Sequence, residues 1–171
     1  MCVFLRLLFI RNSPSACQLG IYNKTMSQVF TTTKRVEFRD TDAAGIMHFS
    51  AYFTYMEEAE HELLRSIGSS VVLNAGEETV SWPRVSATAE YRGPVRFEDE
   101  MTIEVRVKRL GSRSVTYHHQ FLVNDQLIAT GEITAVCCRI EHGEKPSSRE
   151  IPAEIRSKLE VFVDPTLTDA S

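Results

Sequence analysis

The chain has 171 residues, of which 43% are apolar, and this is enough for one globular domain with a sizeable core. Its net charge of −4 and its lack of a basic patch interleaved with aromatic residues argue against nucleic-acid binding. No apolar run reaches the length of a membrane-spanning helix, and the four cysteines form neither a CxxC motif nor a disulfide framework, so we expect a cytoplasmic protein.

The first 25 residues differ in composition from the rest of the chain. They hold basic residues but no acidic one, and their apolar run is short for a signal peptide. We therefore predict that residues 1–25 are a leader that is disordered, acts as a targeting peptide, or is not translated because synthesis begins at Met26. The predicted domain covers residues 26–163, and residues 164–171 are predicted to be a loose tail.

A strand and a long helix are predicted on either side of an acidic turn. Residues 32–39 are rich in β-branched residues and alternate in polarity, which indicates a strand. From residue 50 onward, apolar side chains recur every three or four positions, which indicates a helix with one buried face. Ser50 is expected to cap this helix and Gly68 to end it. The apolar stripe consists of Tyr52, Tyr55, Met56, Ala59, Leu63 and Ile67.

The second half of the chain has the pattern of an antiparallel meander. Polarity alternates along it, and short turns are expected at Gly111 and at Asn124-Asp125. An earlier strand is interrupted at Pro83, which marks an edge or a bulge. One long helix against a curled antiparallel sheet is an α+β architecture. The predicted strands are 79–92, 100–110, 112–123 and 126–139, followed by a loop over 141–150 and a short helix over 152–162.

The acidic turn carries the most specific motif of the chain. Residues 40–46 read D-T-D-A-A-G-I, and the helix that follows ends in L-L-R-S-I-G at residues 63–68. Over about residues 33–139 the sequence resembles the 4-hydroxybenzoyl-CoA thioesterase family, most closely the Tol–Pal-associated acyl-CoA thioesterases. The resemblance implies the hotdog fold, in which a curled antiparallel sheet of five or six strands wraps a long central helix. It also implies an acyl-CoA substrate and a homodimer, or a tetramer of two dimers, with active sites between subunits.

The resemblance also assigns roles to residues around the turn. It makes Asp42 the catalytic carboxylate and the backbone N–H of Phe49 the donor that holds the thioester oxygen. Thioester hydrolysis needs both, because water or a nucleophile must be activated while the oxyanion is stabilised. Asp42 is either a general base or a nucleophile, and Gly45 lets the backbone approach the substrate or adopt a positive φ. The charged end of CoA is expected at Arg113 and Ser114.

Other residues near the turn are candidates for smaller roles. Tyr52 suits the binding of an aromatic or medium-length acyl group, and it equally suits core packing. His48 stands where relatives of this family usually carry Tyr or Trp, and we expect it to line the pocket, with direct proton transfer as the alternative. Glu57, on the helix, is the reserve base. Asp40 is expected to cap the turn.

The sequence predicts no metal, and no cofactor beyond the CoA of the substrate. The acidic motif imitates the start of a calcium loop, but Ala51 stands where a bidentate Glu is needed. His61-Glu62 begins like a zinc-protease motif, but Arg65 replaces the second His. The predicted function is an acyl-CoA thioesterase. The alternatives are a non-catalytic protein that binds acyl-CoA or acyl-carrier protein and, with His48 as the acid–base group, a hotdog hydratase or dehydratase.

Overall fold

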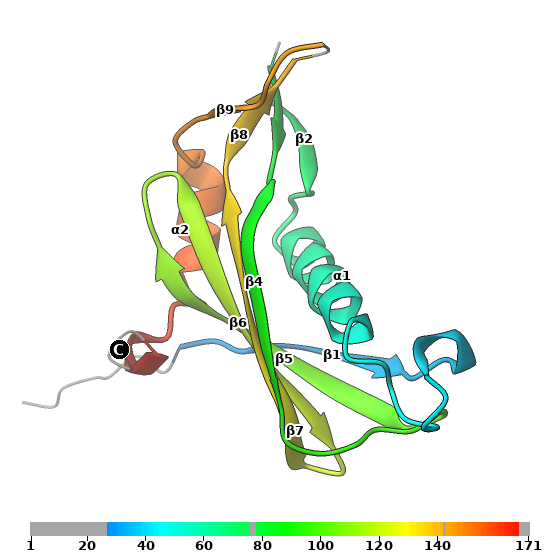
Figure 1. Cartoon of the computed structure of the whole chain (residues 1–171). Helices are drawn as coiled ribbons and strands as arrows, with labels where there is room; N and C mark the ends of the chain where they lie inside the picture. The colour runs from blue at the N-terminus through cyan, green and yellow to red at the C-terminus, as the bar shows by residue number, and fades with distance from the viewer. Residues whose placement is uncertain (1–26, 76–77, 142, 168–171) are drawn as a thin grey trace, which may run out of the picture.

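A five-stranded antiparallel sheet curls around one long helix, α1 (Ala51–Ser66), in this α+β structure (Figure 1). The computed structural model describes residues 27–75, 78–141 and 143–167, so the predicted leader over residues 1–25 lies outside the described residues. The strands of this sheet are β1 (Phe30–Arg35), β4 (Arg84–Tyr91), β5 (Glu100–Leu110), β6 (Ser114–Val123) and β7 (Gln126–Val136), in the order β1-β5-β6-β7-β4.

The predicted meander is confirmed from β5 to β7. Alternate residues of β5 are buried, and the hydrogen-bonded register pairs β5 with β6 and β6 with β7 in antiparallel fashion. Asn124 and Asp125 connect β6 to β7 with positive φ values of 50° and 62°, as a two-residue hairpin turn requires. Residues of β5 that face the helix are Met101, Ile103, Val105 and Val107.

A second, four-stranded sheet extends beyond the C-terminal end of α1 (Figure 1). It divides two predicted strands, because 79–92 and 126–139 each contribute to both sheets. Pro83 has no N–H for a ladder, and Cys137 donates its N–H to the carbonyl oxygen of Arg113 at 2.8 Å instead of to a strand. The strands of the second sheet are β2 (Val72–Ala75), β3 (Glu78–Ser81), β8 (Cys138–Ile140) and β9 (Ser147–Ser148), in the order β2-β3-β8-β9.

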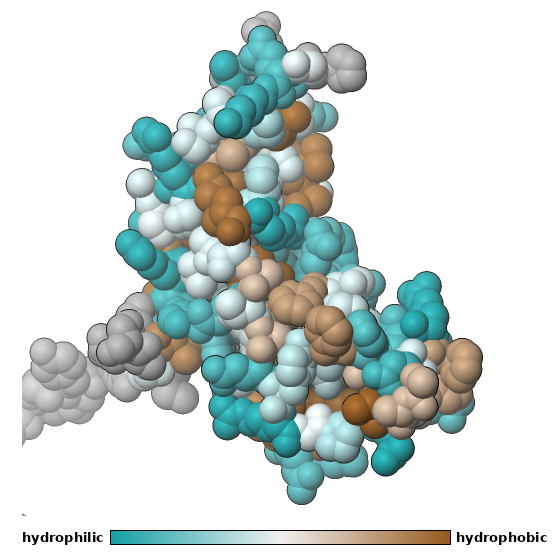
Figure 2. Space-filling model, viewed as in Figure 1, coloured by the Kyte–Doolittle hydropathy of each residue, from teal (hydrophilic) through white to brown (hydrophobic). Residues whose placement is uncertain are grey.

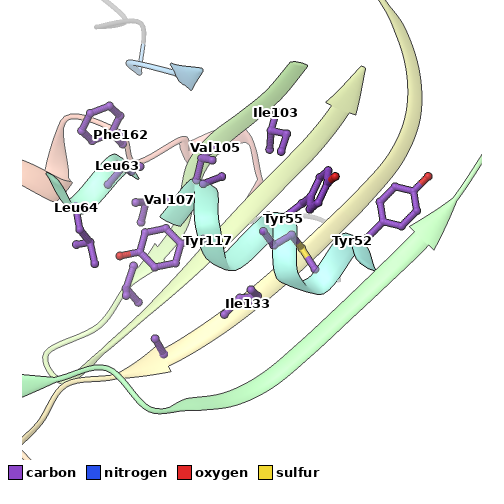
Figure 3. Packing of buried hydrophobic residues seen from close by; sticks show 14 of the residues in the cluster. Tyr52, Tyr55, Leu63, Leu64, Ile103, Val105, Val107, Tyr117, Ile133 and Phe162 are labelled. Atoms are coloured by element: carbon purple, nitrogen blue, oxygen red, sulfur yellow. The ribbon is translucent and has the colours of Figure 1, made fainter. Parts of the chain in front are cut away.

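The core lies between α1 and the concave face of the five-stranded sheet. Figure 3 shows Tyr52, Tyr55, Leu63 and Leu64 of the helix among the aliphatic side chains of the strands. Helix and sheet lie close together at Gly131 of β7, where an added Cβ would lie 2.3 Å from the Met56 sulfur. The predicted apolar stripe therefore packs on the sheet, and a residue without a side chain allows the helix to lie this close.

The two ends of α1 differ in how they are closed. Gly68 has a φ of +73°, and the N–H groups of Gly68 and Ser69 donate to the carbonyl oxygens of Arg65 and Leu64, respectively, at 3.0 and 2.8 Å. This is the Schellman arrangement that the glycine predicted. Ser50 occupies the N-cap position but its hydroxyl does not bond to the helix backbone, so the predicted capping bond is absent.

The C-terminal segment returns to the sheet. Helix α2 (Ala153–Glu160) matches the predicted short helix, and the N–H of Asp164 donates to the carbonyl oxygen of Val107 at 3.0 Å. A 3₁₀ turn, η2 (Pro165–Leu167), follows, so residues 164–167 are held where a loose tail was expected. Neither α1 nor α2, the helices of the described ranges, is long and apolar enough to cross a membrane.

Candidate active site

Backbone hydrogen bonds build the acidic turn between the 3₁₀ helix η1 (Phe38–Asp40) and α1. The N–H of Asp42 donates to the carbonyl oxygen of Ile46 at 3.0 Å, and the N–H of Gly45 donates to that of Asp42 at 2.9 Å. Gly45 has a φ of +70°, a conformation that favours glycine. The exposed Asp42 carboxylate accepts the Ala44 N–H through Oδ1 at 2.8 Å, and Oδ2 has no hydrogen-bond partner among the described residues.

Asp42 borders a pocket of about 420 Å³ whose other walls are mostly apolar. Tyr52, from the first turn of α1, lies edge-to-face against Tyr91 at the end of β4, with ring centroids 5.0 Å apart. The hydroxyl of Tyr91 donates to the carbonyl oxygen of Phe49 at 3.0 Å and so joins β4 to the start of α1. Burial raises the pKa of Tyr52 to about 12, so its hydroxyl stays protonated. The pocket is lined by Asp42, Ile46, Met47, Phe49, Tyr52, Tyr91, Gly93, Pro94 and Val95.

The start of α1 leaves a backbone amide unpaired beside this pocket. The N–H groups of Ala51 and Phe53 donate to the carbonyl oxygens of His48 and Ser50, respectively. The Phe49 N–H, by contrast, makes no hydrogen bond within the part of the chain that the structure describes. Such an amide at a helix N-terminus is a ready donor to an oxyanion, because the helix dipole adds partial positive charge there.

Asp40 has a structural role in the same turn. The single proton of the Tyr55 hydroxyl is shared between two acceptors, Oδ2 of Asp40 at 2.8 Å and the carbonyl oxygen of Arg35 at 3.0 Å. Burial and the hydrogen bond to Asp40 raise the pKa of Tyr55. The backbone of Asp40 accepts the His48 N–H at 2.7 Å, so this residue ties the turn both to α1 and to the segment before it. The two aspartates of the motif are therefore used differently.

His48 lies next to the pocket and is not among the residues that line it. Its Nδ1 lies 2.7 Å from the Ser50 hydroxyl oxygen, and its ring contacts the Phe49 ring at a centroid distance of 4.5 Å. The structure thus accounts for the side chain of Ser50, which bonds to His48 instead of capping α1.

Three predicted site residues lie away from Asp42 within the single chain. Glu57 contacts Arg84 of β4, with 3.4 Å between Oε1 and Nη1. Arg113 and Ser114 lie at the far end of β5 from the acidic turn, and this eleven-residue strand spans roughly 35 Å at about 3.3 Å per residue. Of the predicted site residues, only Asp42, Phe49 and Tyr52 line the pocket together.

Sequence reasoning missed the wall of the pocket that comes from the segment after β4. Val95 accepts the Met47 N–H at 2.7 Å through its carbonyl oxygen, and Gly93 and Pro94 stand beside it. Gly93-Pro94 has the pattern of an ordinary turn, and nothing in the local sequence signals that it folds against residues 42–52. The described residues contain no group of three or more His, Cys, Asp or Glu side chains placed to hold a metal.

Residues 36–159 match the family model of the thioesterase-like superfamily. The chain belongs to this superfamily. The predicted hotdog fold and the predicted class, thioester hydrolase, are thereby confirmed at the level of the family. A putative esterase of Aquifex aeolicus is 34% identical over 137 residues, which cover 79% of this chain and 98% of the relative.

Two further relatives carry the names of specific thioesterases. The 1,4-dihydroxy-2-naphthoyl-CoA hydrolase of Synechococcus sp. (strain CC9605) is 36% identical over 104 residues, which cover 58% of this chain and 70% of the relative. The solved structure of BH1999 gentisyl-coenzyme A thioesterase superposes with a TM-score of 0.65 at 26% identity, covering 75% of this chain and 98% of that one.

Proposed function

We propose that the protein is an acyl-CoA thioesterase that hydrolyses a CoA thioester to a free acid and CoA. The observation that carries this proposal is the mostly apolar pocket, whose lining includes Asp42 and Phe49, the residue whose backbone N–H has no hydrogen-bond partner among the described residues. A carboxylate and an oxyanion donor on two sides of a bound carbonyl are what thioester hydrolysis needs. The names of the relatives support the same class of reaction.

Two routes fit Asp42. As a general base, Asp42 removes a proton from water, the water oxygen attacks the thioester carbonyl carbon, and the C–S bond breaks as CoA thiolate leaves and is protonated. As a nucleophile, the Asp42 carboxylate attacks the carbonyl carbon, and the C–S bond breaks as CoA thiolate leaves and is protonated. The resulting mixed anhydride between Asp42 and the acyl group is then hydrolysed by water, which frees the acid and the Asp42 carboxylate. In both routes the carbonyl oxygen becomes negative and accepts the Phe49 N–H, an interaction worth about 3 kcal/mol in comparable sites.

The acyl group that we propose is aromatic. Tyr52, Tyr91 and Phe49 surround the pocket with rings, and edge-to-face or stacked contacts favour a flat aromatic ligand. The Synechococcus relative is named for a naphthoyl thioester and BH1999 for a gentisyl thioester, both of which are aromatic. No cofactor is invoked beyond the CoA of the substrate, and a cytoplasmic location stays a prediction.

The proposed active form is a homodimer that pairs the edge strands β4 of two copies. Among the described residues β4 is an edge strand of the sheet, with no strand paired to its outer side, and most of its residues are exposed. Apolar surface lies among polar surface on the face that carries β4 (Figure 2), and Val85 and Phe49 are 64% and 60% exposed. An antiparallel strand edge is self-complementary under a two-fold axis. In this arrangement we infer that Arg113 and Ser114, far from Asp42 in one chain, reach CoA from another subunit.

A panel of acyl-CoA thioesters tests the proposal by the rate of thiol release. We expect benzoyl-type thioesters to react faster than octanoyl-CoA or acetyl-CoA, and Asp42→Asn to retain binding while losing hydrolysis. Binding of CoA esters by the wild type without thiol release would instead favour the non-catalytic acyl-CoA binder. Hydration of an enoyl-CoA that is lost in His48→Ala would favour the hydratase.

A further inference from the structure

Arg84, the first residue of β4, is the centre of a second polar cluster that the proposed chemistry does not use. Its Nη2 lies 3.0 Å from His61 Nε2 and 3.1 Å from Glu60 Oε1, and its Nη1 lies 3.4 Å from Glu57 Oε1. Nη1 also donates to the carbonyl oxygen of Trp82 at 3.2 Å. We call Glu57, Glu60, His61 and Arg84 the Arg84 cluster. Three of its members are on α1, so it fastens the head of the edge strand to the helix.

Glu60 is the unusual member of the Arg84 cluster, because its side chain is 0% exposed. Burial raises the pKa of Glu60 to about 7, against the opposing effect of Arg84. The ion pair with Arg84 lacks hydrogen-bond alignment, and neither Glu60 oxygen has a hydrogen-bond partner among the described residues. The buried hydroxyl of Tyr117, on β6, is likewise unpartnered and has its pKa raised, first by burial and then by the charge of Glu60.

This arrangement is a poor way to stabilise a fold. A buried ion pair loses much of its Coulomb attraction to desolvation, and an apolar pair of similar size is often equally stable or more stable. Buried polar groups without partners add a further penalty. The side chains of Glu57 and His61 are 48% and 27% exposed, so the Arg84 cluster reaches the surface beside the edge of β4, to which no described strand is paired. The Arg84 cluster therefore contributes little to stability, and its distinctive feature is its position beside the edge of β4.

The two ends of β4 have different neighbours. Arg84 and its cluster stand at the head of the strand, whereas Tyr91, at its tail, lines the Asp42 pocket. When an antiparallel strand pairs with a second copy of itself about a two-fold axis, the head of each copy lies beside the tail of the other. The Arg84 cluster of one subunit is then next to the Asp42 pocket of its neighbour.

We propose that Arg84, held in place by Glu60, acts in trans as a positioning residue that completes the wall of the neighbouring subunit's Asp42 pocket. This inference rests on the proposed thioesterase function and on the pairing of β4 between two copies. The guanidinium has its Nη groups engaged by Trp82, Glu57, Glu60 and His61, so it does not itself bind the substrate. It orients the exposed parts of the Arg84 cluster toward the neighbour.

Mixed dimers of two inactive variants test the inference directly. Arg84→Met is expected to lower kcat/KM at least about tenfold, and Asp42→Asn to abolish hydrolysis. When the two variants are unfolded together and allowed to reassociate at random, a trans arrangement restores about one quarter of wild-type activity, because half of the dimers contain one site with both native residues. No restoration, or an Arg84→Met enzyme within about twofold of wild type, would overturn the inference.

Control variants separate positioning from loss of the fold. Lys108→Met removes an ion pair of 2.7 Å with Glu132 on the opposite face of the sheet, and it should change kcat/KM by less than about twofold. Arg84→Lys keeps the positive charge and should retain part of the activity that Arg84→Met loses. If Arg84→Met fails to fold because Glu60 is left as an unpaired buried charge, the double variant Glu60→Gln/Arg84→Met removes that charge as well. The mixed-dimer experiment is repeated with the double variant in that case, with the same two outcomes.

The dependence of kcat/KM on pH distinguishes a positioning role of Glu60 from a purely structural one. The charged and titratable groups around Glu60 are Glu57 and His61 on α1, Arg84 on β4 and Tyr117 on β6. We expect kcat/KM of the wild type to change between pH 6 and 8 as Glu60 titrates, and Glu60→Gln to lose this change. Equal profiles would overturn the role of Glu60. A monomeric wild type that hydrolyses thioesters would overturn the trans arrangement alone, whereas absence of hydrolysis would overturn the proposed function.

Discussion

Asp42 precedes helix α1 and Glu60 lies within it, and the surroundings of these two carboxylates are opposite. Asp42 sits in an exposed glycine turn before α1, with one oxygen bonded to a backbone amide and one unpartnered among the described residues. Glu60 is fully buried beneath the head of β4 and has only an imperfect ion pair with Arg84. Because Asp42 is accessible, it is suited to chemistry on a ligand, whereas burial makes the charge of Glu60 sensitive to pH near neutrality.

Removing the exposed carboxylate should have the largest effect, and on activity alone. Asp42→Asn keeps the acceptor for the Ala44 N–H, so we expect the midpoint of thermal unfolding to stay nearly constant while kcat falls about a thousandfold. Thiol release and a thermal melt measure the two quantities on one sample. Glu98→Gln, an exposed carboxylate on the loop before β5, is the matched control, and comparable loss in that variant would remove the special role of Asp42.

Neutralising the buried carboxylate should instead change how stability depends on pH. The pKa of Glu60 in the folded protein is about 7, above its ordinary value of 4.5, so its contribution is fully present below pH 4.5 and is lost as pH rises through 7. We expect the wild type to lose about 3 kcal/mol more unfolding free energy than Glu60→Gln between pH 4.5 and 8, as measured by urea unfolding.

Glu62, on the same helix, gives a control of opposite sign. Partial burial raises the pKa of Glu62, but hydrogen bonds from Lys34 and Thr32 have the larger combined effect, so the pKa is lowered. Stability from Glu62 is therefore present at neutral pH and lost in acid, and Glu62→Gln should flatten the acid side of the curve only. Parallel curves for the wild type and Glu60→Gln would show that Glu60 is not buried as described.

The close contact between α1 and β7 should be sensitive to a single methyl group. Gly131→Ala places a Cβ against the Met56 sulfur, and we expect about 2 kcal/mol of destabilisation from overpacking, measured by chemical denaturation. Gly93→Ala is the control, because its Cβ would meet Ile128 at an ordinary 3.6 Å. If both variants melt like the wild type, the helix does not lie as close to the sheet as the structure has it.

The smallest expected effect concerns the aspartate that supports the turn. Tyr55→Phe removes hydrogen bonds to Asp40 and to the backbone of Arg35, and it should cost about 1 kcal/mol of unfolding free energy. Tyr91→Phe, which loses one exposed bond to the Phe49 carbonyl oxygen, should cost less. The reverse order in denaturant titrations would mean that Tyr91, and not Tyr55, holds the start of α1.

The sequence by itself determined the elements whose signals are local. The apolar stripe of α1, its glycine stop at Gly68, the alternation along β5 and the acidic turn before α1 all follow from spacing between neighbouring residues, and each lies in the structure as predicted. The motif at residues 40–46 also led to the correct superfamily.

Tertiary structure alone decided what depends on residues distant in sequence. The division of the last predicted strand at Cys137 results from which backbone groups are free to pair, and the far wall of the pocket comes from Val95 and its neighbours folding against the acidic turn. The burial of Glu60 beneath Arg84 has no local signal, since a Glu in a charged helix has the same sequence pattern whether it faces water or a strand. Local spacing fixes conformation, whereas burial and pairing depend on which surfaces meet after the chain has folded.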